Sequence, residues 1–80
     1  MRVSLNVAQI RELVDAITAG DKERIDTLAE KLGLRVEWYG SHFRLRRGVR
    51  SVACRLGMPR EQLETPMRVL FGRLWLVARR

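Results

Sequence analysis

The chain has 80 residues, of which 46% are hydrophobic, and a formal net charge of +7 at pH 7. This length fits one domain and the hydrophobic share supports a packed core, so a disordered chain is excluded and a single domain over residues 1–80 is predicted. Cys54 is the only cysteine, which excludes the disulfide framework of small secreted domains. No apolar run is long enough to cross a membrane, and Arg11 and Glu12 interrupt the first one. We therefore expect a cytoplasmic protein without a membrane partner.

The excess of positive over negative charge lies in the second half of the chain. Residues 1–35 carry six Lys or Arg and six Asp or Glu, whereas residues 36–80 carry ten and three. All ten basic residues of the second half are arginine, whose flat guanidinium suits phosphate and carboxylate groups. Such a one-sided charge favours a polyanion or an acidic protein surface as the partner.

The first part of the chain predicts two helices. Apolar residues recur at helical spacing over residues 7–19 and again over about residues 22–32. The tight Gly20–Asp21 connection makes the two helices an antiparallel hairpin within residues 1–34. Capping and terminating residues frame the helices: Asn6 and Gly20 for the first, Asp21 and Gly33 for the second.

A β-hairpin is predicted next, because apolar and polar residues alternate over residues 35–39 and residues 42–46. Gly40–Ser41 lies between the two runs and fits a two-residue turn. The outward face of the second strand then presents His42, Arg44 and Arg46.

The remaining chain predicts a helix at about residues 49–56, a short helical turn ended by Pro66, and a second hairpin over residues 67–78 around Gly72–Arg73. The last segment also fits one amphipathic helix. The fold class is α+β in the order ααββαββ, with the N-terminal helical hairpin packed on a small antiparallel sheet. Residues 35–80 form its basic, β-rich part.

Residues 50–63 resemble a helix–turn–helix motif. Ala53 lies four residues before Gly57, where a small residue lets two helices approach and glycine permits the sharp turn. The resemblance implies a recognition helix at residues 60–65 and a wing formed by the following hairpin. The exposed side chains of that recognition helix are then Arg60, Gln62 and Glu64. The alternative is a capped helix followed by a helical turn.

We predict no catalytic, metal or cofactor site and no small-molecule substrate. One histidine and one cysteine do not supply the about four ligands of a structural zinc site, and no phosphate-binding glycine loop is present. Acidic and basic residues alternate over residues 12–31 at helical spacing, which is typical of a solvated helix face. Cys54 is either an inert packed thiol or a reactive thiol activated by Arg50 and Arg55.

The densest basic stretch, residues 44–50, lies among aromatic residues. Arginines near aromatic rings can contact phosphates and stack on bases. The partner-binding residues predicted from this pattern are Tyr39, His42, Arg44, Arg46, Arg47, Arg50, Arg55 and Arg60.

Two functions fit these observations. The first is a non-enzymatic binding module that acts on nucleic acid, or on a nucleic-acid-handling complex, through an arginine-rich face. The alternative is a phage-type inhibitor, of the anti-CRISPR kind, that docks its basic face on an acidic surface of a nucleoprotein complex and blocks nucleic-acid binding. A monomer and a homodimer both remain open.

Overall fold

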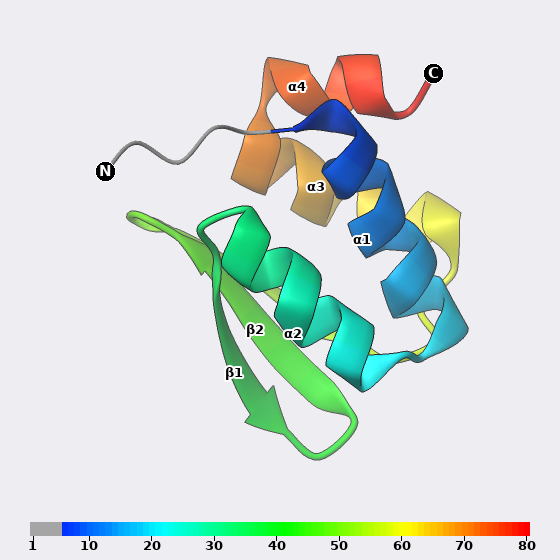
Figure 1. Cartoon of the computed structure of the whole chain (residues 1–80), viewed down its shortest axis with the longest axis vertical. Helices are drawn as coiled ribbons and strands as arrows, with labels where there is room; N and C mark the ends of the chain where they lie inside the picture. Colours follow the sequence, from blue (N-terminus) through cyan, green and yellow to red (C-terminus); the bar gives the residue numbers. More distant parts are fainter. Residues whose placement is uncertain (1–5) are drawn as a thin grey trace.

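A computed structural model describes residues 6–80 and confirms the α+β class (Figure 1). Residues 1–5, part of the predicted 1–34 segment, lie outside the described residues. The elements in chain order are α1 (Val7–Ala19), α2 (Lys22–Lys31), β1 (Arg35–Tyr39), β2 (His42–Arg47), β3 (Arg50–Arg55), the 3-10 helix η1 (Arg60–Leu63), α3 (Glu64–Phe71) and α4 (Arg73–Ala78).

The two N-terminal helices are confirmed, with Asn6, Gly20 and Asp21 at their predicted places. The second helix ends one residue earlier than predicted, with Leu32 as its C-cap and Gly33 following at a φ of 73°. The Asn6 side chain accepts hydrogen bonds from the amides of Ala8 and Gln9 at the start of α1. Gly20 ends α1 with a φ of 70°, in the left-handed region that favours glycine. Asp21 caps α2 by accepting from the Arg24 amide. Local sequence therefore sets both helix boundaries.

The first predicted β-hairpin is confirmed in its register as well. β1 and β2 pair antiparallel, with Tyr39 opposite His42 around the two-residue turn. Gly40 has a φ of 65°, which a II′ turn requires at its first central position. The hairpin thus fixes which residues share a face.

The predicted helix at residues 49–56 is wrong, because residues 50–55 form the third strand, β3. Gly48–Val49 is a second two-residue turn that places Arg47 opposite Arg50, and Gly48 has a φ of 59°. Val49, in this turn, is fully exposed. The helix–turn–helix resemblance fails with this helix, since its first half is a strand.

The predicted second hairpin over residues 67–78 is also wrong, and the sheet formed by the described residues 6–80 has three strands instead of four. Pro66 lies in the first turn of α3, where its missing amide is not needed. Gly72 separates α3 from α4 with φ 57° and ψ −128°, a conformation open to glycine. The helical periodicity of this segment is therefore real, but it spans two helices. The observed order is ααβββ, then η1 and two helices.

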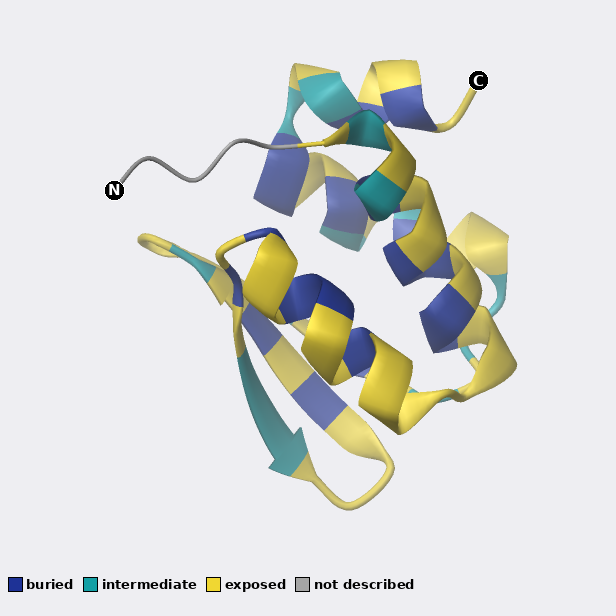
Figure 2. Cartoon of the chain, in the orientation of Figure 1, coloured by how far each residue is buried: buried dark blue, intermediate teal, exposed yellow. Residues whose placement is uncertain are grey.

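One face of the sheet packs on the helices. Along β2, buried and exposed residues alternate (Figure 2). On the buried side, Trp38 donates its Nε1–H to Asp26 Oδ1 of α2 at 2.8 Å, and the Lys22 Nζ lies 4.6 Å from the Trp38 ring centroid. The buried strand residues Phe43, Leu45 and Cys54 join the helical residues Ile10, Leu13, Ile17, Ile25, Leu28, Leu63, Met67, Leu70 and Trp75 in one core.

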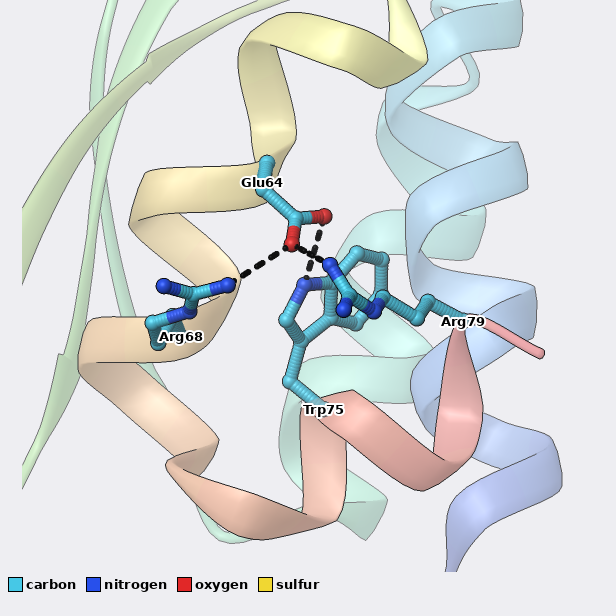
Figure 3. Close-up of polar contacts among 4 residues, drawn as sticks. All are labelled: Glu64, Arg68, Trp75 and Arg79. Atoms are coloured by element: carbon cyan, nitrogen blue, oxygen red, sulfur yellow. Dashed lines mark hydrogen bonds and ion pairs between the residues drawn. The ribbon is translucent and has the colours of Figure 1, made fainter.

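Glu64 joins the two C-terminal helices (Figure 3). Its Oε2 accepts from Trp75 Nε1 at 2.9 Å, and its Oε1 accepts from Arg68 Nη2 at 3.2 Å and from Arg79. Burial raises the pKa of the Glu64 carboxyl, but the Trp75 hydrogen bond and the two arginines outweigh this effect and lower its pKa from 4.5. Arg79 and Trp75 thus hold α4 against α3, whereas Arg68 pairs with Glu64 within α3.

Candidate functional site

The side of the sheet opposite the helices forms a regular array, here called the outer face. Successive residues of a strand point to opposite sides. Phe43 and Leu45 of β2 and their register partners in β1 and β3 face the helices, so the alternating set of nine strand positions points outward. The strand register arranges them in three rows: Arg35, Arg46 and Ser51; Glu37, Arg44 and Ala53; Tyr39, His42 and Arg55.

Solvent reaches almost the whole outer face. Eight of its nine residues are exposed, and Glu37 is half-buried. The large side chain of Tyr39 is 62% exposed. Within residues 6–80, no helix covers this face, because the strand residues that contact the helical core alternate with these nine. An antiparallel sheet of this kind packs one face on the core and leaves the other in contact with solvent.

The outer face has a net charge of +3, from four arginines and one glutamate. Arg46 Nε lies 3.0 Å from Glu37 Oε1, so that pair is neutral. The other polar contacts are long: Arg44 Nη1 to Ser51 Oγ is 3.5 Å, and Arg55 Nη2 to Gln62 Oε1 is 3.4 Å. Among residues 6–80, the guanidinium groups of Arg35, Arg44 and Arg55 have no carboxylate within ion-pair distance.

Two arginines face each other directly across the strands, since Arg35 is the register partner of Arg46. Like charges in this position destabilise a sheet. A packing requirement does not explain the pair, because both residues are exposed. An arrangement that opposes folding and concentrates positive charge is expected where the charge has a binding role.

The predicted cluster at residues 44–50 is divided by the strand alternation. Arg44 and Arg46 lie on the outer face, whereas Arg47 and Arg50 lie at the β2–β3 turn with the opposite strand parity. Arg47 Nη1 donates to the Leu70 carbonyl oxygen of α3 at 2.7 Å. Arg50 is exposed, and a shallow hollow of about 370 Å³ is lined by Arg47, Gly48, Val49 and Arg50. Arg50 is therefore exposed at the β2–β3 turn but does not belong to the outer face.

The structure does not bring Arg60 into the outer face. It lies in η1, and its Nη1 is 2.6 Å from Asp15 Oδ1 of α1. Tyr39, His42 and Arg55, which were predicted together with it, form one row of the outer face. The long-range pairing with Asp15 has no local sequence signal. Residues 60–65 are helical as expected, but the preceding helix of the helix–turn–helix resemblance is the strand β3.

Arg35 belongs to the outer face, although sequence reasoning did not select it. It begins β1 and is exposed beside Arg46. The signal was present, because the alternation that turns Val36 and Trp38 inward turns residues 35, 37 and 39 outward. Only the pairing of β1 with β2 shows that residues 35, 37 and 39 lie directly beside Arg46, Arg44 and His42 of β2.

Other chemistry is sparse in the described residues. Cys54 is buried on the inner side of β3, and burial raises its pKa to about 11. This supports the inert thiol over the reactive one. Residues 6–80 contain no group of three His, Cys, Asp or Glu side chains placed to hold a metal ion. No helix among them is both long and apolar enough to span a bilayer.

Comparisons with protein families, with curated proteins and with solved structures find no match for this chain. A functional assignment therefore depends on the outer face itself. Within the described part of the chain, its three properties are a three-stranded β surface without a covering helix, three guanidinium groups without an ion-pair partner and one exposed tyrosine.

Proposed function

We propose that the chain is a non-enzymatic nucleic-acid-binding module that contacts the phosphate backbone with its outer face. One observation carries the proposal: four arginines share a helix-free sheet face with a single carboxylate, and three of them lack an ion-pair partner among residues 6–80. Phosphate groups are the ligands that would neutralise such a face.

The chemistry of the side chains supports phosphate as the ligand. A guanidinium presents parallel N–H donors that match two oxygens of one phosphate. Arg44 and Arg46 are two residues apart on one strand, so their Cα atoms lie about 6.6 Å apart along it. The exposed hydroxyl of Ser51 and the ring of His42 add polar groups to neighbouring rows. Backbone contacts of this kind position a nucleic acid without reading its sequence.

The second candidate is an acidic protein surface, as in the inhibitor hypothesis. The observation that favours it is the exposure of Tyr39, because tyrosine is enriched among the residues that anchor protein interfaces. Carboxylates of a partner would then take the place of phosphates on the same arginines. Recovery of a stoichiometric protein partner from nuclease-treated lysate, together with no affinity for oligonucleotides, would favour this candidate.

The test compares two triple variants with equal loss of charge. Arg44, Arg46 and Arg55→Gln neutralises the outer face. Arg11, Arg24 and Lys31→Gln removes the same charge from exposed positions of α1 and α2. Binding to a fluorescein-labelled 20-nucleotide strand and to its duplex is measured by anisotropy between 20 and 300 mM NaCl.

The expected result is a strong salt dependence that belongs to the outer face alone. Four neutralised phosphates give a slope of log K against log salt of about −2.8 for a single strand and −3.6 for a duplex. The outer-face variant should flatten the slope by about 2 to 3, and the control variant should leave it unchanged. Equal losses in both variants, or flat isotherms for the wild type at low salt, would contradict the proposal.

A further inference from the structure

We infer that the outer face takes an unpaired nucleic-acid strand, with one base stacked on Tyr39 and the backbone following the arginines of β2. This inference rests on the proposed function and narrows it from nucleic acid in general to single strands. Two independent features of the outer face carry it. They are its shape and the position of Tyr39, which among the described residues is the only Phe, Tyr or Trp on that face.

The shape of the sheet does not suit the major groove of a duplex. That groove is about 12 Å wide and admits a helix or a two-stranded ribbon. Here the strands are three, about 4.8 Å apart, and arginine side chains widen the surface further. The inner side is packed on the helices through residues such as Phe43 and Leu45, so the sheet cannot enter a groove edge-on. A flexible single strand can instead lie flat across the three strands.

Tyr39 is placed as a stacking platform. It ends β1 on the outer face, next to His42, and 62% of it is exposed. The other aromatic residues of the hairpin point inward, where the Trp38 and Phe43 rings pack with centroids 4.8 Å apart. The Tyr39 ring is therefore left outside the core. A base can stack on an aromatic ring whatever its identity, but only when its own face is free, which requires an unpaired strand.

The arrangement of the face gives the strand a direction to follow. Tyr39, His42 and Arg55 form the row nearest the β1–β2 turn, and the rows of Arg44 and Arg46 lead away from it. A base on Tyr39 thus lies at one end of a track of guanidinium groups. Rings and cations combined in this way are typical of proteins that bind single strands without sequence preference.

The test uses three probes at low salt: labelled dT12, a 12-residue strand with the same phosphates and abasic sites throughout, and a 12-base-pair duplex. They are titrated with the wild type, Tyr39→Ala and Tyr39→Phe. Tyr39 is exposed, so neither variant should unfold, and thermal melting checks this. We expect dT12 to bind most tightly.

Tyr39→Ala should weaken binding of dT12 by about 5- to 150-fold, the effect of losing one base–aromatic stack. Tyr39→Phe retains the ring and should stay within about twofold of the wild type. Tyr39→Ala should leave the abasic strand unaffected. Duplex binding as tight as dT12 binding, or an unchanged affinity of Tyr39→Ala for dT12, would overturn the single-strand inference while leaving the arginine contacts intact. Failure of all three probes to bind would overturn the proposed function as well.

Discussion

Arg35→Glu should stabilise the fold and weaken binding at the same time. Arg35 lies directly opposite Arg46, and both side chains are exposed. The substitution removes a like-charge pair and creates an opposite-charge pair at the same position. Cross-strand charge pairs contribute about 0.2–1 kcal/mol. Because Arg46 already contacts Glu37 at 3.0 Å, we expect a gain near the middle of this range, about 0.5 kcal/mol.

This gain corresponds to an increase in Tm of about 2–4 °C for a domain of this size. Circular dichroism melting in 10 mM and 500 mM NaCl measures it, and the gain should shrink at high salt because exposed charges are screened. Arg35→Gln is the matched control, since it removes the repulsion without adding an attraction, and its gain should be smaller. An unchanged or lower Tm for Arg35→Glu at low salt would show that the two arginines do not repel each other enough to destabilise the sheet. Their pairing would then no longer support a binding role for the outer face.

Three further predictions concern the core and the C-terminal helices. Gly72→Ala should lower the free energy of unfolding, measured in urea, by about 1–3 kcal/mol. The loss comes entirely from the backbone conformation, because an added Cβ meets nothing within 4 Å. A loss below about 0.5 kcal/mol would contradict a turn that requires glycine. The lowered pKa of Glu64 means that its contribution to stability is complete above pH 4.5 and is lost as the pH falls through the lowered pKa. Glu64→Gln should therefore have a flatter decline of the urea midpoint below pH 4.5 than the wild type, and parallel curves would refute this. Cys54, with a pKa of about 11, should resist a thiol reagent at pH 8 in the native protein and react fully in denaturant; rapid native labelling would contradict its burial.

The helical hairpin and the first β-hairpin could be predicted because their signals are local. Asn6, Gly20 and Asp21 cap or end the helices through bonds to residues only a few positions away. The Gly40–Ser41 turn likewise sets the register of β1 and β2 by itself. Elements whose ends are fixed by neighbouring residues can be located without knowledge of the tertiary structure.

The strand β3 was mistaken for a helix because its apolar residues satisfy both periods. Val52 and Leu56 are four apart, which fits a helix, but Val52, Cys54 and Leu56 also alternate, which fits a strand. The pairing with β2 decides the matter, since it buries Cys54 opposite Phe43. The local signal that could have separated the two was Gly48–Val49, a glycine-first two-residue turn of the same kind as Gly40–Ser41.

The C-terminal segment shows the opposite error. Its β-favouring residues suggested strands, but Met67, Leu70, Phe71, Trp75 and Ala78 are buried at helical spacing. Their burial against α1 and the sheet outweighs the weak local preference.

For the candidate site, the sequence located the arginines of β2 but not the residues that lie beside them. The contribution of Arg35 and the loss of Arg60 both follow from contacts between distant segments.

The central claim, that the outer face is the binding surface, is tested most directly by mapping contacts on isotopically labelled protein. Nitrogen-15 spectra, including the arginine Nε–H signals, are recorded during titration with dT12. Arg35, Arg44, Arg46 and Arg55 should shift together with the amides of their strands, while α1 and α2 stay unchanged. Shifts confined to the exposed arginines of the C-terminal helical region, Arg73 and Arg80, with a silent sheet, would contradict the account.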